Sequence, residues 1–110
     1  MVLMRISILA GLCALVASPS PVAQAAAPTP PSRLGLCAAC HGTHGHSRMP
    51  GVPNLAGQRL DYLRDALRQY RDGRRAVPVM RTAIGPLSDA QLDALAVWYG
   101  EQAPAPRNRP

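Results

Sequence analysis

The sequence is poor in cysteine, and this limits the sites that it can form. It contains three cysteines, at positions 13, 37 and 40. A structural zinc site needs four ligands, but no second cysteine pair follows Cys40, and only His44 and His46 lie nearby. A thioredoxin-like redox pair needs a βαβ context, and the chain has no strand-like run of residues. These absences argue against a zinc site and against a dithiol redox site.

The sequence contains no lysine, so all 12 basic residues are arginines. They outnumber the 6 acidic residues and give a net charge of +6. No basic cluster occurs beyond Arg74-Arg75, which argues against nucleic-acid binding. The excess charge fits either a solvated, mildly basic surface or electrostatic steering towards an acidic partner.

No apolar run is long enough to span a bilayer, because the longest, Ile6 to Val16, is too short for a transmembrane helix. Arg5 precedes it and Ala23-Gln24-Ala25 follows as an A-x-A cleavage site, so residues 1–25 are predicted to be a secretory signal peptide. Cleavage would remove Cys13 and lower the net charge to +5. We therefore expect a periplasmic protein with no membrane anchor after cleavage.

The five residues Cys37-Ala38-Ala39-Cys40-His41 form the most informative motif of the chain. C-x-x-C-H is typical of the attachment of a c-type haem. Each cysteine sulfur adds to one vinyl group of the porphyrin, and the histidine is the proximal ligand of the iron. The motif occurs once and the chain has no internal repeat, so we predict one covalent haem.

The segments on either side of this motif contain many proline and glycine residues. Residues 26–32 include three prolines and are predicted to be a flexible lead-in, with Ser32 as a possible N-cap for a short helix that enters the motif. After His41, residues 42–54 are predicted to form a long loop around the haem edge. Residues 33–102 form the expected domain, and residues 103–110 a disordered tail.

Two amphipathic helices are predicted after this loop. The first runs over 58–72, with a buried stripe of leucines that ends at Tyr70 and with Gly73 after its last residue. The second runs over 89–102, with Leu92, Leu95, Ala96 and Tyr99 on its buried stripe. Ser88 and Gln91 form a capping-box pattern at its start. Prolines bracket Met80 in the segment between the helices, which predicts at most a short helical turn there.

The order of these parts resembles that of the bacterial class I c-type cytochromes, and of single domains of the periplasmic dihaem group in particular. The resemblance covers about residues 36–101 and includes the haem motif, the stretch Pro53 to Gln58, the Met80 loop and Trp98-Tyr99. It implies an all-α fold of three to five helices around one haem with His and Met axial ligands. It also implies that the first and last helices cross, although the helix before Cys37 is short here and the chain has no phenylalanine.

The resemblance also implies roles for single residues. Cys37 and Cys40 match the thioether cysteines and His41 the proximal ligand. Pro53 matches the proline whose carbonyl accepts a hydrogen bond from that histidine. Leu55 matches an apolar residue against the haem, and Met80 matches the distal ligand.

The residues alone also indicate which methionine is the distal ligand of the iron, without the resemblance to the family. Only Met49 and Met80 follow the signal peptide. Met49 lies four residues before Pro53, a reach of roughly 14 Å, which is too short to pass round the haem edge to its far face. Met80 is therefore favoured over Met49, and over His44 and His46, which lie closer still to His41 and are interpreted as exposed loop histidines.

A His/Met pair fills both axial sites, so the haem can exchange electrons but has no position for a substrate. We therefore expect a one-electron carrier and not an enzyme, with a membrane or periplasmic oxidase, reductase or dehydrogenase as its partner. We hypothesise that a ring of arginines around the exposed haem edge meets an acidic surface of the partner: Arg48, Arg59, Arg74, Arg75 and Arg81. Two alternatives remain open: a dedicated cytochrome subunit of one dehydrogenase or reductase, and a gas-binding or peroxidase-like protein if Met80 is not a ligand.

Overall fold

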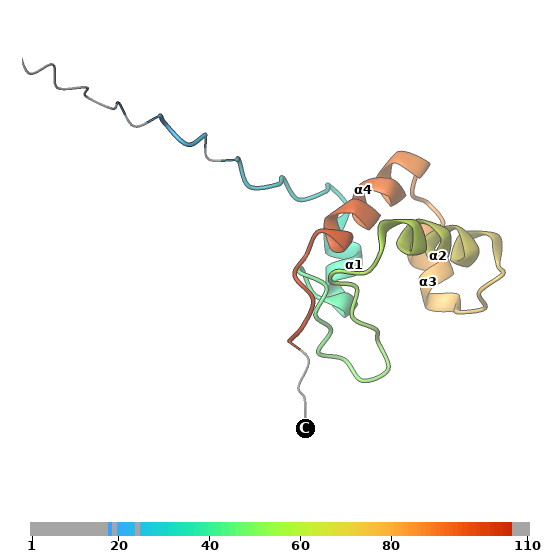
Figure 1. Cartoon of the computed structure of the whole chain (residues 1–110). Helices are drawn as coiled ribbons and strands as arrows, with labels where there is room; N and C mark the ends of the chain where they lie inside the picture. The colour runs from blue at the N-terminus through green and yellow to red at the C-terminus, as the bar shows by residue number, and fades with distance from the viewer. Residues whose placement is uncertain (1–17, 19, 24, 107–110) are drawn as a thin grey trace, which may run out of the picture.

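The computed structural model describes Ser18, residues 20–23 and residues 25–106. Most of the predicted signal peptide therefore lies outside the described residues. The described part contains four α-helices and no strand, as predicted for an all-α fold (Figure 1). None of these helices combines the length and apolar character needed to cross a membrane. Residues 25–31 have no regular structure and lead away from the folded domain (Figure 1).

The helices are α1 (Leu34–His41), α2 (Leu60–Asp72), α3 (Pro78–Ile84) and α4 (Asp89–Gly100). Helix α2 packs against both α3 and α4. It ends where predicted, because Gly73 adopts a left-handed conformation with φ of 84° that glycine tolerates without a steric penalty.

The predicted capping box at the start of α4 is confirmed. The backbone N of Gln91 donates to Ser88 Oγ at 3.2 Å, and the backbone N of Ser88 donates to Gln91 Oε1 at 3.0 Å. Two backbone N–H groups that have no helical carbonyl to donate to thus find hydrogen-bond acceptors.

Two local predictions were wrong. The segment around Met80 is a helix of seven residues and not just a short turn, because Pro78 stands at its first position, where the missing N–H is no loss. Ser32 does not cap α1, whose N-cap is Arg33 and has no side-chain cap.

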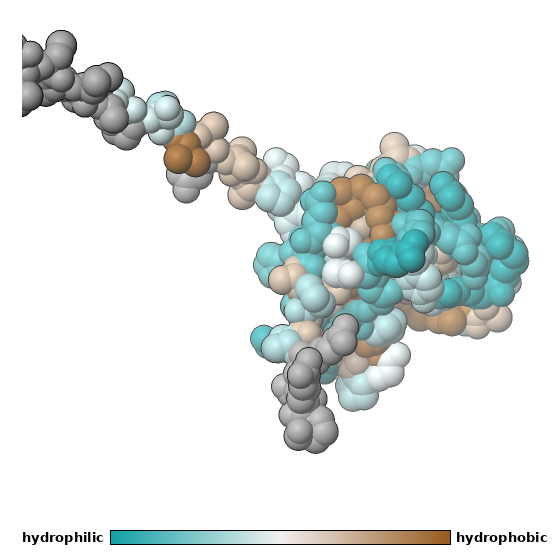
Figure 2. Space-filling model, viewed as in Figure 1, coloured by the Kyte–Doolittle hydropathy of each residue, from teal (hydrophilic) through white to brown (hydrophobic). Residues whose placement is uncertain are grey.

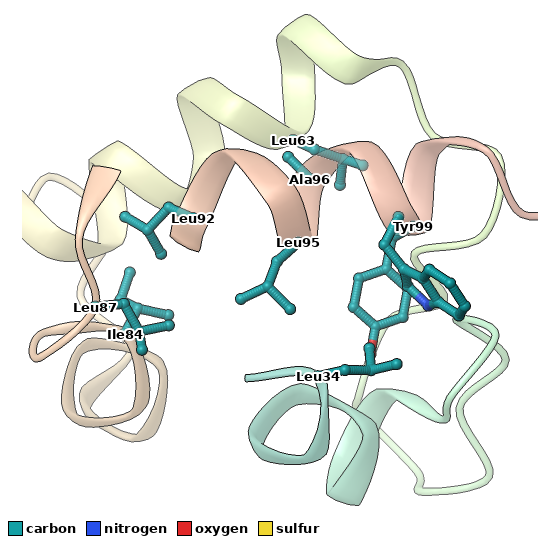
Figure 3. Close-up of a cluster of buried hydrophobic side chains, with 9 residues drawn as sticks. Leu34, Leu63, Ile84, Leu87, Leu92, Leu95, Ala96 and Tyr99 are labelled. Atoms are coloured by element: carbon teal, nitrogen blue, oxygen red, sulfur yellow. The ribbon is translucent and has the colours of Figure 1, made fainter. Parts of the chain in front are cut away.

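The core runs along the inner face of α4 (Figure 3). The four residues predicted for the buried stripe of α4 are all buried, and Leu95 is only 2% exposed. At one end the core includes Ile84 and Leu87, and at the other Leu34 of α1 lies close to Tyr99 (Figure 3). Even the short first helix therefore contributes to the core beside the last one.

Hydrogen bonds join the C-terminal turn of α4 to the loop that follows α1. Trp98 Nε1 donates to the Thr43 carbonyl at 2.8 Å, and the Tyr99 hydroxyl donates to the Gly42 carbonyl at 3.0 Å. In the opposite direction, Gly57 N donates to the Tyr99 carbonyl at 3.1 Å. Buried polar groups need such partners, and here they fix the loop that follows His41.

Candidate haem-binding site

A mainly apolar cavity of about 340 Å³ is enclosed by all four helices and by the loop between α1 and α2. The predicted site residues Cys37, Cys40, His41, Pro53, Leu55 and Met80 all line it. Residues far apart in the sequence thus meet at one site. Leu95 points into the space between the two ends of the core (Figure 3) and also lines the cavity.

Cys37 and Cys40 lie three residues apart on α1, so they occupy one face of the helix. Both are free thiols and partly buried. Burial raises the pKa of the Cys37 thiol, and Cys40 raises it further. Both thiols line the apolar cavity, a placement that suits addition to two vinyl groups.

His41 is the last residue of α1 and is 6% exposed. Its Nδ1 lies 2.9 Å from the Pro53 carbonyl oxygen, the hydrogen bond that the resemblance implied. A carbonyl can only accept, so Nδ1 carries the proton and Nε2 keeps its lone pair. The ring is therefore held in the tautomer that a metal ligand requires.

The loop before Pro53 is tied back to α1. Ser47 Oγ donates to the Cys40 carbonyl at 3.0 Å, and Asn54 Oδ1 accepts from Ser47 N at 2.8 Å. The Gly45 carbonyl accepts from the backbone N of Leu55 at 2.9 Å and of Ala56 at 3.2 Å. These contacts hold the Pro53 carbonyl against His41.

The two methionines differ in position. Met80 is partly buried in α3 and lines the cavity, with its side chain packed against the core. Met49 is 48% exposed and does not line the cavity. This difference supports Met80 as the thioether ligand.

The two loop histidines are exposed and do not line the cavity. His44 Nδ1 lies 3.0 Å from Gln102 Oε1, and its ring stacks against Trp98 with centroids 6.2 Å apart. His44 is thus part of the junction between the loop and α4.

The five arginines of the hypothetical ring have different environments. Arg59 and Arg74 form exposed ion pairs with acidic residues two positions away. Arg48 and Arg81 are exposed. Arg75 instead lines the cavity, so it is part of the site and not of a free charged surface.

The residues around the cavity mouth were not predicted from the sequence. Tyr62, Val77 and Val79 line the cavity while 47%, 40% and 68% exposed, and Leu36 from α1 is similarly exposed. Figure 2 shows a largely hydrophilic face with apolar side chains over α4 and along the edge formed by α3. The available signal was the two valines on either side of Pro78, on a segment with no buried stripe.

The residues present fit a haem c. Two free thiols, an oriented imidazole and a thioether from another helix converge on one apolar cavity. A bare metal ion fits less well, since the described residues contain no group of three His, Cys, Asp or Glu side chains that could hold one.

Residues 35–98 match the protein family described as cytochrome c oxidase, cbb3-type, subunit III. The chain is 38% identical over 73 residues to cytochrome c-554(548) of Halomonas halodenitrificans, an alignment that covers 64% of this chain and 88% of the relative. It is 40% identical over 92 residues to the thiosulfate dehydrogenase electron acceptor of Thiomonas intermedia, covering 83% of this chain and 41% of that protein.

A solved structure of cytochrome c4 from Acidithiobacillus ferrooxidans is similar to this fold. The TM-score is 0.55 at 31% sequence identity, and the match covers 59% of this chain and 37% of that one. The chain thus spans most of the Halomonas cytochrome but less than half of the other two proteins.

Proposed function

Because the chain belongs to the class I c-type cytochromes, in the family described as cytochrome c oxidase, cbb3-type, subunit III, we propose that it is a periplasmic one-electron carrier whose haem iron is bound by His41 and Met80. Family membership confirms the predicted class and the covalently bound haem c. It also identifies the chain as an electron-transfer protein. The axial ligands, the compartment and the partner belong to the proposal.

One observation carries the proposal: His41 and Met80 come from different helices and line the same apolar cavity. Bound haem supplies one-electron ferric/ferrous chemistry. His41 presents Nε2 because Pro53 holds its Nδ1 proton. Met80 supplies a thioether, which favours the ferrous state and raises the reduction potential. His41 and Met80 would both hold the iron of a bound haem, and this would leave no coordination position for a substrate.

The rim of the cavity is suited to brief protein contacts. Leu36, Tyr62, Val77 and Val79 are exposed around it, and exposed Arg48 and Arg81 add positive charge to the domain. A small apolar contact with a charged surround gives fast, weak association. The partner we propose is a redox protein with an acidic docking surface, and association should weaken as ionic strength rises.

The predicted signal peptide and the extracytoplasmic attachment of haem c support a periplasmic location. The test is the N-terminus of the exported protein, which should be Ala26, recovered from the periplasmic fraction. A haem-loaded protein that retains Met1 in the cytoplasm would contradict it.

A second candidate is a dedicated acceptor for one dehydrogenase. The similarity to a protein named as a thiosulfate dehydrogenase electron acceptor favours it. Co-purification of a stoichiometric complex from the native periplasm would select this function over a freely diffusing shuttle.

The visible spectra of three proteins test the axial ligation: wild type, Met80→Ala and Met49→Ala. We expect a low-spin wild type with the weak long-wavelength sulfur-to-iron band, loss of this band in Met80→Ala, and its retention in Met49→Ala. A high-spin wild type, or loss of the band in Met49→Ala alone, would contradict the proposed ligand.

A further inference from the structure

Helix α2 carries three arginines on a face different from the one that lines the haem cavity. Arg64, Arg68 and Arg71 are spaced by four and three residues, so their side chains lie along one side of the helix. They border a groove of about 310 Å³ between α2 and α4, two helices that pack side by side (Figure 1). Among the described residues, only Leu67 lines both the groove and the cavity, so the two are separate sites.

Two of these arginines form ion pairs with α4. Arg64 donates two hydrogen bonds to the Asp93 carboxylate, through Nε and Nη2. Arg71 donates from Nη2 to Asp89 Oδ1, and from Nη1 to the Leu87 carbonyl at 3.4 Å. These contacts extend both guanidinium groups from α2 towards α4 and hold them there.

Arg68 lies between these two arginines on α2 and is exposed. No carboxylate pairs with it among the described residues, where the ion pairs of the groove are Arg64–Asp93 and Arg71–Asp89. The Asp89 side chain is 88% exposed, and an ion pair with so exposed a carboxylate is weak. The groove therefore contains three guanidinium groups and two carboxylates, one of which is held weakly.

The groove also has apolar surface and a defined length. Leu67 is half-buried, Ala90 is exposed on the facing helix, and Leu92 between them is only 4% exposed. From Arg64 to Arg71 the row of arginines extends about 10 Å along α2, which is longer than one small oxyanion. Several carboxylates on one chain match this length, and the aliphatic parts of their side chains can cover the apolar residues.

We propose that the α2–α4 groove binds an acidic segment of a second protein, whose carboxylates pair with Arg68 and displace Asp89 from Arg71. A guanidinium donates paired N–H groups to a carboxylate, and the net positive charge of the chain attracts an acidic segment. Docking here leaves the rim of the haem cavity uncovered, so one partner holds the protein while the haem edge exchanges electrons with another. This surface is separate from the docking rim of the proposed function and does not depend on the axial ligands.

The probe is an acetylated hexaglutamate peptide, added to the reduced, haem-loaded protein at an ionic strength of about 10 mM, where charge screening is weak. The chemical shifts of the backbone amides locate the contact. Those of Arg68, Ala90 and Asp93 should move, and those of Val77 and Val79 at the cavity rim should not. Shifts confined to the rim would overturn the groove as the docking surface.

Two matched pairs of variants separate the groove from the overall charge. Arg68→Gln and Arg48→Gln each remove an exposed arginine that has no carboxylate partner among the described residues, but Arg48 lies in the loop between α1 and α2. Arg68→Gln should weaken peptide binding by roughly fivefold, and Arg48→Gln much less. Asp89→Asn frees Arg71 and should strengthen binding, whereas Asp61→Asn, which changes the charge equally but lies outside the groove, should have a much smaller effect.

Equal effects within each pair of variants would overturn the proposal, because the peptide would then respond to net charge alone. Binding of inorganic phosphate with the same affinity as the peptide would also overturn it, since one oxyanion does not span the row of arginines. The axial ligation is read from the sulfur-to-iron band and not from these titrations, so failure of this proposal would leave the proposed function intact.

Discussion

Gly45 offers a sharp test of how the loop is held against His41. It is buried and has a φ of +76°, and an added Cβ would lie 2.5 Å from the Ala56 backbone nitrogen and 3.0 Å from Tyr99 Cδ1. Gly51 provides a matched control, because its φ is +77° but an added Cβ would meet nothing within 4 Å. Alanine at either position carries the left-handed backbone penalty of about 1–2 kcal/mol.

Only Gly45→Ala should also disturb packing. The Ala56 backbone must move, and this weakens the two hydrogen bonds that the Gly45 carbonyl accepts from Leu55 and Ala56. At about 1 kcal/mol for each bond, Gly45→Ala should cost about 2 kcal/mol more than Gly51→Ala. For a domain of this size that is a difference in Tm of about 8–16 °C.

The assay is thermal unfolding of both haem-loaded variants, followed by far-ultraviolet circular dichroism. The sulfur-to-iron band should disappear at a lower temperature in Gly45→Ala as well, because the Pro53 carbonyl loses its support. Equal Tm values for the two variants would refute the argument that this glycine is required by packing.

Two further predictions concern helix ends and ion pairs. Ser88→Ala removes the capping hydrogen bond of α4 and should lower the free energy of unfolding by about 1 kcal/mol. Ser32→Ala removes no cap and should leave the Tm unchanged. Equal losses of Tm in the two variants would contradict the assignment of the cap. The hydrogen bond from Arg64 lowers the pKa of Asp93 in the folded state. The stabilisation of the fold by this ion pair is therefore present above the unfolded pKa of about 4 and is lost as the pH falls through the lower folded pKa. The Tm of Asp93→Asn should fall less steeply on acidification than that of wild type, and parallel curves of Tm against pH would contradict this.

The sequence predicted best those elements that local signals determine. The 3.6-residue periodicity and Gly73 predicted the end of α2, and the Ser88–Gln91 pattern predicted the start of α4. The helix around Met80 was underestimated, because Pro78 was interpreted as a breaker when it stands at the first helical position, where proline is favoured.

The site was predictable to the extent that its residues lie in motifs. The pair His41–Pro53 came from the resemblance, and its hydrogen bond is present. Arg75 was grouped with surface arginines, because nothing in a single sequence shows that two tyrosines eight residues apart on α2 bracket a guanidinium from the next connection. Such contacts depend on tertiary packing and have no local signal.

Carbon monoxide binding to the ferrous protein tests the central claim most directly, because this gas needs a vacant axial position on the iron. With His41 and Met80 both bound, the wild-type spectrum should not change when carbon monoxide is added, and Met80→Ala should form the adduct at once. Rapid formation of the adduct by the wild type would contradict a carrier that exchanges electrons alone, and would favour a gas-binding or peroxidase-like haem.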